Sequence, residues 1–186
     1  MASISRLPGE CERMAITPTL GIVGFSGAGK TTLAVRLVRR LVGEQMRVAA
    51  IKHTHHELNG HRRGDSALLA EAGAEPVLLC CSGEAVEFSS SGARSITYRR
   101  VEELRAGLEA DVVVIEGFKG SGGWPRIVVW HAGREPWDDW QEAVAVVAHG
   151  NAIESGRRAA ASRGLPFFGS EQFEELRGFL GRISRE

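Results

Sequence analysis

A glycine-rich segment near the start of the chain, residues 24–31, carries the residue types best suited to chemistry. Its sequence GFSGAGKT fits the pattern GxxxxGK[ST] at every fixed position. The glycines allow successive backbone N–H groups to turn toward a phosphate, and the helix expected at Lys30 adds the positive end of its dipole. The Lys30 ammonium would contact the β- and γ-phosphates, and the Thr31 hydroxyl would ligate Mg²⁺. The predicted phosphate-binding residues are Gly24, Ser26, Gly27, Ala28, Gly29, Lys30, Thr31 and Thr32.

A magnesium ion held by Thr31 needs an acidic residue from a neighbouring strand. The segment DVVVIEG places Asp111 at one end of an apolar run and Glu116 at the other. Because the carboxyl ends of parallel strands meet beside a phosphate loop, we predict that Glu116 holds the metal through water or directs a water. Asp65 opens a later helix and either reaches the metal region or only caps that helix. The predicted metal ligands are Thr31, Glu116 and Asp65, and the predicted catalytic residues are Lys30, Glu116 and Asp65.

A histidine-rich stretch follows the second expected strand. The sequence KHTHH begins at Lys52, and four of the six histidines lie between His53 and His61. This stretch lacks the cysteine ligands and the helical HxxxH spacing typical of zinc sites. The spacing leaves two interpretations open, a solvated polar loop and a loop that binds a ligand.

A sheet must position these residues, and the apolar pattern predicts one. Short β-branched runs alternate with longer helical stripes, which is typical of a parallel sheet with helices on both faces. Two runs around SSGA, residues 84–89 and 95–99, predict a surface β-hairpin. The fold class is therefore α/β, with three layers, a mostly parallel sheet and a β-hairpin extension. The other predicted strands are residues 20–24, 47–52, 77–81, 112–115, 127–130 and 144–148, and the predicted helices are residues 30–42, 65–72, 101–108 and 171–183.

Length and composition limit the classes of protein that fit. The chain has 186 residues, and we expect a flexible leader, 1–18, before one nucleotide-binding domain, 19–186. Lys and Arg number 23, as do Asp and Glu, so the zero net charge argues against a nucleic-acid partner. No apolar run approaches the ~18 residues that cross a bilayer, and no signal peptide stands out, so no membrane partner is expected. Three cysteines give no disulfide framework, which favours the cytoplasm.

The motifs in their order resemble the molybdopterin-guanine dinucleotide biosynthesis adapter family, MobB, within the P-loop NTPase superfamily. The resemblance rests on GFSGAGKTTL, on IKHTHH after the next strand and on GDSALLAEAGA before the third. It continues through DVVVIEGFK and PRIVVW, and these motifs together span most of residues 20–130. The phosphate loop alone is generic, whereas KHTHH followed by EGFK is specific to this family.

The resemblance implies a nucleotide-binding P-loop fold, usually dimeric, that binds GTP with Mg²⁺ and hydrolyses it slowly if at all. It also implies an accessory role beside the guanylyltransferase that joins molybdopterin to GMP. The implied partners are therefore that enzyme, molybdopterin or its guanine dinucleotide, and a second copy of the chain. The residues that match segments proposed to face the phosphates or the pterin are Lys52, His53 and Asp65. Those that match the second nucleotide-side motif are Glu116, Gly117 and Lys119.

One departure from the family pattern concerns the base. Family members often carry an Asp after a late strand, where its carboxylate can pair with the N1 and N2 hydrogens of guanine. Here residues 146–150 read VVAHG and offer no carboxylate. Backbone carbonyls or Asn151 would have to replace that contact, so GTP is the expected nucleotide and ATP stays open.

Two other functions fit the residues. A structural module would use the nucleotide as an assembly ligand and pair through the edge of the hairpin at residues 84–99. A small-molecule kinase using ATP or GTP would need lid charges, for which the candidates are Arg62, Arg63, Arg157, Arg158 and Arg163. No arginine finger stands in a fixed motif, so as an enzyme the chain is expected to be at most a slow GTPase.

Overall fold

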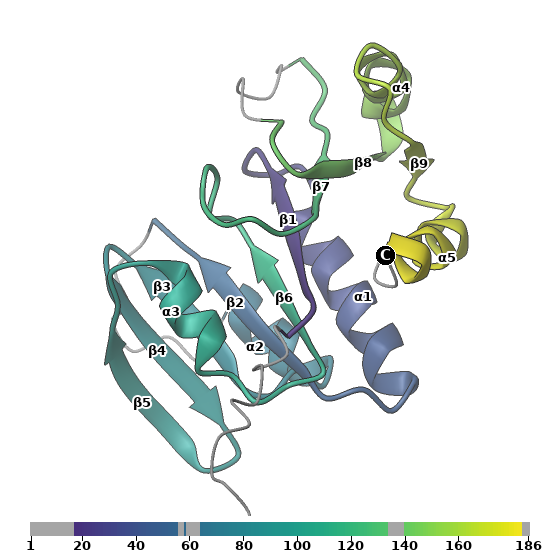
Figure 1. Ribbon diagram of the computed structural model, residues 1–186. Helices are drawn as coiled ribbons and strands as arrows, with labels where there is room; N and C mark the ends of the chain where they lie inside the picture. Colours follow the sequence, from purple (N-terminus) through teal and green to yellow (C-terminus); the bar gives the residue numbers. More distant parts are fainter. Residues whose placement is uncertain (1–16, 56–57, 59–63, 134–139, 184–186) are drawn as a thin grey trace, which may run out of the picture.

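One sheet organises the computed structural model, which describes residues 17–55, 58, 64–133 and 140–183. Within these residues the strand order is β5-β4-β3-β2-β6-β1-β7-β8-β9 (Figure 1). The strands are β1 (Thr19–Gly24), β2 (Val48–His53), β3 (Val77–Cys81), β4 (Glu84–Ser89), β5 (Gly92–Thr97), β6 (Val112–Glu116), β7 (Arg126–Val129), β8 (Ala143–Ala148) and β9 (Phe167–Gly169). The helices are α1 (Lys30–Gly43), α2 (Asp65–Glu71), α3 (Val101–Ala106), α4 (Ile153–Ala161) and α5 (Phe173–Ile183), with a 3₁₀ turn η1 (Gly150–Ala152).

The sheet is parallel from β3 to β9, and β4 and β5 extend it as an antiparallel hairpin. Helices α1, α2 and α5 pack on one face of the sheet, whereas α3 and α4 pack on the other. Neighbouring side chains of a strand enter opposite faces, so Val114 joins the cluster under α1 and Ile115 joins the cluster under α3. The predicted three-layer α/β fold with a mostly parallel sheet is confirmed.

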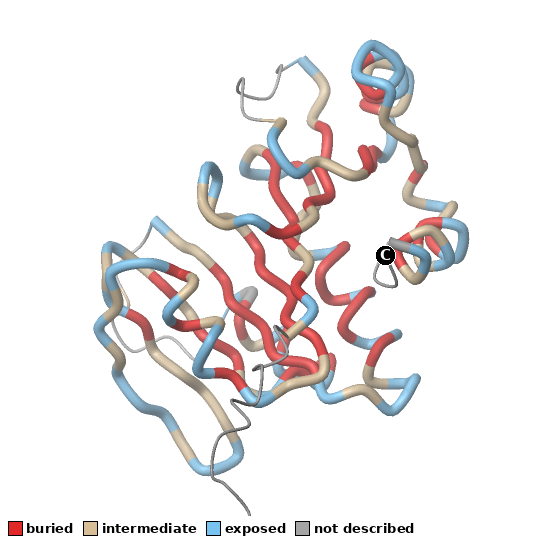
Figure 2. The backbone as a smooth tube through the Cα atoms, viewed as in Figure 1, coloured by how far each residue is buried: buried red, intermediate tan, exposed pale blue. Residues whose placement is uncertain are grey.

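The central strands and α1 show why these residues fold this way. All five residues of β6 are buried, because helices cover both faces of a parallel sheet (Figure 2). Helix α1 buries an apolar stripe that includes Leu33 and Leu37, while Arg36 and Arg40 stay exposed. This packing fixes the end of β1 and the start of α1, which the phosphate loop joins.

The hairpin and the C-terminal third differ from the expectation in detail. Strand β5 begins at Gly92, three residues before the predicted start, because β4 and β5 meet through a tight turn in which Ser89 pairs with Gly92. Helix α4 and strand β9 lie in a part of the chain where only the last helix was predicted. No helix among the described residues is long and apolar enough to span a bilayer.

Candidate phosphate-binding site

The phosphate loop has the backbone that its glycines predict. Strand β1 ends at Gly24, α1 begins at Lys30, and Gly27 and Gly29 between them have φ of 77° and 91°. These values lie in the left-handed region that glycine adopts without a steric penalty. A Cβ on Gly24 would lie 2.4 Å from the carbonyl oxygen of Val129, so this position has no room for a side chain. The segment between β1 and α1 therefore has a backbone that glycine adopts at these positions and that leaves no room for a side chain at Gly24.

A cavity of about 720 Å³ opens over this loop. The predicted phosphate-binding residues all line it except Ala28, whose side chain is 1% exposed and packs into the core. The carboxyl ends of β2 and β6, with the segments that follow them, supply the other predicted residues that line it, namely Lys52, His53, Glu116, Gly117 and Lys119. The predicted site residues thus converge from distant parts of the sequence on one end of the sheet.

Half-buried Thr31 forms a polar cluster in this cavity with the buried residues Lys52 and Glu116. The Thr31 hydroxyl donates to both carboxylate oxygens of Glu116, at 2.9 and 3.0 Å. Nζ of Lys52 lies 2.7 Å from Oε1 of Glu116 and donates to Oγ1 of Thr31 at 3.1 Å. The side chains of Lys52 and Glu116 are only 10% and 5% exposed. Their positions follow from strand register, since Lys52 of β2 and Glu116 of β6 are paired residues.

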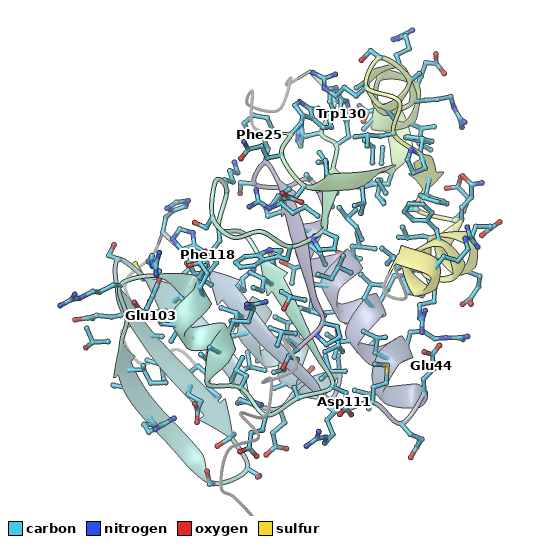
Figure 3. The ribbon with its side chains drawn as sticks, viewed as in Figure 1. Phe25, Glu44, Glu103, Asp111, Phe118 and Trp130 are labelled. Atoms are coloured by element: carbon cyan, nitrogen blue, oxygen red, sulfur yellow. The ribbon has the colours of Figure 1, made fainter. Side chains whose placement is uncertain are left out.

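The hydroxyl of Thr31 and the carboxylate of Glu116 fit a magnesium ion. Oxygen atoms of these two kinds are the ligands that Mg²⁺ prefers beside nucleotide phosphates, and here they lie within hydrogen-bond distance of each other. Asp111 lies at the opposite end of β6, where it pairs with Arg47 at 2.7 Å (Figure 3). The sequence argument thus chose the carboxylate of this strand that the cavity contains.

Asp65 does not occupy the predicted N-cap position of its helix. Helix α2 begins at Asp65 and its N-cap is Gly64, so Asp65 is the first helical residue and the predicted cap position was wrong by one residue. Its side chain lies outside the described part of the chain, so its role as a metal ligand stays a prediction. His56 and His61 of the histidine-rich stretch also lie outside the described residues.

Every lysine of the chain lies in this cavity. The sequence contains three lysines, Lys30, Lys52 and Lys119, against twenty arginines. Nζ of Lys30 donates to the carbonyl oxygen of Phe25 at 2.8 Å, and Nζ of Lys119 lies 4.8 Å from the centroid of the Phe25 ring. Burial lowers the pKa of Lys119 from its ordinary value. The scarcity of lysine is a sequence signal for this site that motif matching does not use.

The segment after β6 forms the wall of the cavity opposite the loop. Gly117 has φ of 93°, and a Cβ there would lie 2.9 Å from Cβ of His53. Arg126 donates from its guanidinium to the carbonyl oxygens of Ser121 and Gly122, which ties this segment to β7. The lining residues that sequence reasoning did not assign are Thr54, His55, Phe118 and Ser121. Thr54, His55 and Phe118 lie within the KHTHH and EGFK motifs and Ser121 lies two residues after the second, so membership of these motifs was the available signal.

Histidines stand on both sides of the loop. The His53 ring lies 4.8 Å from that of His55 and 4.9 Å from that of Phe118, and burial, followed by the charge of His55, lowers the pKa of His53. Across the loop, Nε2 of His149 lies 3.2 Å from the carbonyl oxygen of Ala28. Within the described residues, no three His, Cys, Asp or Glu side chains are grouped to hold a metal ion. The described histidines thus line the cavity at His53 and His55 and contact the loop at His149.

The comparison with protein families bears on the whole motif-bearing region. Residues 19–149 match the family described as molybdopterin guanine dinucleotide synthesis protein B, MobB. This match covers more than half of the chain and contains the phosphate loop, Lys52 and Glu116. The chain belongs to the MobB family. The resemblance read from the motifs is thereby confirmed.

Individual MobB relatives agree with this assignment. The chain is 35% identical over 103 residues to the molybdopterin-guanine dinucleotide biosynthesis adapter protein of Haemophilus influenzae, covering 55% of this chain and 57% of that one. The Escherichia coli adapter protein is 30% identical over 104 residues, covering 55% and 59%. The matches thus span little more than half the length of these curated relatives.

A solved MobB structure agrees with the fold. The crystal structure of Bacillus subtilis MobB superposes with a TM-score of 0.54 and 20% identity, covering 88% of this chain and 96% of that one. At this identity the likeness is evidence for the fold only.

Proposed function

We propose that the chain is a GTP-binding adapter of molybdopterin guanine dinucleotide biosynthesis that binds its nucleotide with Mg²⁺. The observation that carries this proposal is the hydroxyl–carboxylate pair of Thr31 and Glu116 beside an open glycine loop. Backbone N–H groups of the loop and the Lys30 ammonium would hold the β- and γ-phosphates, while Thr31 and Glu116 would hold the metal. A bound magnesium ion would neutralise charge on the phosphate oxygens.

We also propose that the chain hydrolyses GTP slowly or not at all. No arginine is among the described residues that line the cavity, whereas fast phosphoryl transfer in this class of site relies on an arginine finger. We assign the chain a delivery role beside a molybdopterin guanylyltransferase that does the chemistry, and we place it in the cytoplasm, which its few cysteines favour. Molybdopterin or its guanine dinucleotide would be the second ligand, and a homodimer would be the working form. Light scattering with and without nucleotide tests the dimer.

Recognition of the base would depend on the segment that follows β8. Strand β8 ends at Ala148 and is followed by His149 and the 3₁₀ turn, so no carboxylate side chain reaches the base from residues 146–150. Guanine would then be read by backbone carbonyls or by the Asn151 side chain. Such contacts discriminate less strongly than a bidentate carboxylate, so we expect a modest preference for GTP over ATP.

Titration calorimetry with GTP and ATP in the presence of Mg²⁺ tests nucleotide binding directly. Binding of GTP is expected, and failure to bind either purine triphosphate would overturn the proposal. A guanylyltransferase assay tests the adapter role, because the chain with GTP should raise the yield of guanine dinucleotide. The Lys30→Ala variant is the control and should give no increase.

A second cavity next to the first supports a small-molecule kinase as the other candidate function. This cavity, of about 450 Å³, shares His53, Phe118 and Ser121 with the first, and Arg99 and Arg100 also line it, so a phosphoryl acceptor has a place to bind. The positions of the arginines considered for a kinase lid favour the adapter function instead. Those that the structure describes, on and just after α4, contact Phe167, Glu154 and Trp140, and none lines the first cavity. Nucleoside diphosphate release that strictly requires a second substrate would favour the kinase.

A further inference from the structure

The ammonium of Lys52 lies where a metal ion would bind the phosphate site. It contacts Oγ1 of Thr31 and Oε1 of Glu116, which are atoms of the two groups that fit Mg²⁺. The contact is buried, and it is fixed by the in-register pairing of Lys52 and Glu116 on adjacent strands. A positive charge of the protein itself thus already contacts both the hydroxyl and the carboxylate.

The hydrogen-bond directions make this ammonium a competitor of the metal. The Thr31 hydroxyl has one proton, which it donates to Glu116, and its oxygen accepts from Lys52, which can only donate. Mg²⁺ binds oxygen at about 2.0–2.1 Å and needs a lone pair directed at it. One of the two lone pairs of the Thr31 oxygen accepts from Lys52, and the same ammonium lies 2.7 Å from Oε1 of Glu116, so a metal that bridges the hydroxyl and the carboxylate would have to displace it.

We propose that Lys52 is a resident cation in the magnesium position, which keeps Thr31 and Glu116 assembled before the metal arrives and is displaced when Mg²⁺ binds. This inference rests on the proposed function, since a nucleoside triphosphate is the ligand that would bring the metal. Lys52 lines the same cavity as the loop, so its flexible stem can turn the displaced ammonium toward the phosphates. Lys52 then sets how strongly nucleotide binding depends on Mg²⁺.

The decisive measurement is the ratio of triphosphate dissociation constants in EDTA and in Mg²⁺. In Lys52→Met, Glu116 loses its counter-charge, so metal-free nucleotide is repelled while the metal meets no competitor. The ratio should therefore rise about tenfold or more over wild type. The matched control is Lys119→Met, which removes a lysine of the same cavity that lies over Phe25. It should weaken binding about equally in both conditions, and an unchanged or smaller ratio in Lys52→Met would overturn the proposal.

A nucleotide-free measurement separates this inference from the proposed function. Wild type that binds no triphosphate in either condition would refute the function, and Mn²⁺ titration followed by electron paramagnetic resonance would still test Lys52. Lys52→Met should bind Mn²⁺ about tenfold more tightly than wild type, because the resident cation is gone. Equal Mn²⁺ affinity would overturn the role of Lys52.

Wild-type protein supplies a test that no folding defect can compromise. The chain has three lysine ammonium signals in heteronuclear NMR, and Lys30→Ala and Lys119→Met assign two of them, which leaves Lys52. Adding GTP with Mg²⁺ should shift the Lys52 signal strongly, and adding GTP with EDTA should leave it close to its nucleotide-free position. A Lys52 signal that is the same with and without the metal would refute displacement.

Discussion

The two sides of the phosphate loop are built differently. Toward β2 and β6, Thr31, Lys52 and Glu116 are joined by buried contacts of 2.7–3.1 Å between charged or hydroxyl groups. Toward β7 and β8, an exposed imidazole, His149, meets the carbonyl of Ala28 at 3.2 Å. We call these, after the roles proposed above, the metal side and the base side. On the metal side, strand register fixes Lys52 and Glu116, and the start of α1 fixes Thr31, whereas on the base side a surface residue sits against the loop.

This difference shows which part of the proposed nucleotide site is built into the buried part of the fold. A buried ion pair must be complete, since removing one partner leaves an uncompensated charge in a poorly solvated place. An exposed hydrogen bond exchanges readily with water and contributes little net free energy. Substitutions on the metal side should therefore change both the free energy of unfolding and the affinity for a triphosphate. Substitutions on the base side should change only the affinity, and only slightly.

The largest expected effect comes from the carboxylate of the metal side. Glu116→Gln leaves the Lys52 ammonium buried without its counter-charge, so we expect a loss of about 3–5 kcal/mol in the free energy of unfolding. Chemical denaturation of the nucleotide-free protein measures this loss. The control is Asp111→Asn at the other end of β6, whose partner Arg47 is exposed, and it should leave the unfolding midpoint nearly unchanged. Equal destabilisation by both variants would contradict the contrast between buried and exposed pairs.

The next effect concerns the loop itself, which both sides share. Lys30→Ala removes the ammonium expected on the phosphates, so triphosphate affinity should fall about a hundredfold, the range for a hydrogen bond to a charged group. Arg39→Ala, an exposed cation on the same helix, should leave the affinity unchanged. Titration calorimetry in Mg²⁺ measures both. Retained affinity in Lys30→Ala would mean that the backbone N–H groups suffice.

The phosphate loop and Glu116 could be predicted from the sequence because local rules determine them. GxxxxGK[ST] sets the loop backbone within eight residues, and parallel strands bring their carboxyl ends to one edge of a sheet, which separates Glu116 from Asp111. The alternation of apolar runs and helical stripes was likewise enough for the three-layer fold. These features depend on residue type and order and not on exact register.

What escaped prediction depends on register or on weak patterns. The contact between Lys52 and Glu116 needs the pairing of β2 with β6, and two strands that are buried on both faces carry no alternation from which a register can be read. Strand β9 has three residues and α4 is rich in small residues, so neither gives a strong periodic signal. The Asp65 cap was misplaced by one residue because Gly64 supplies the non-helical backbone just before the helix.

A smaller effect tests the base side. His149→Ala removes the hydrogen bond to Ala28, so triphosphate affinity should fall about threefold, as for one partly solvated hydrogen bond. The free energy of unfolding should hardly change, in contrast to Glu116→Gln. The ratio of GTP to ATP affinity decides what His149 does. An unchanged ratio fits a residue that only supports the loop, and a changed ratio would place base discrimination on this side after all.

The smallest expected effect is the pH dependence of folding stability that His53, on the metal side, contributes. Burial, together with the charge of His55, lowers the pKa of folded His53 below its ordinary value of 6.5. As the pH falls below that value, the unfolded chain takes up the proton first, so stability is complete above about pH 6.5 and decreases on acidification until the lower folded pKa is reached. Unfolding midpoints measured across this range should fall less in His53→Gln than in wild type. An identical slope in both proteins would mean that the imidazole is not shielded from water, and the metal side would then be less enclosed than its buried ion pair indicates.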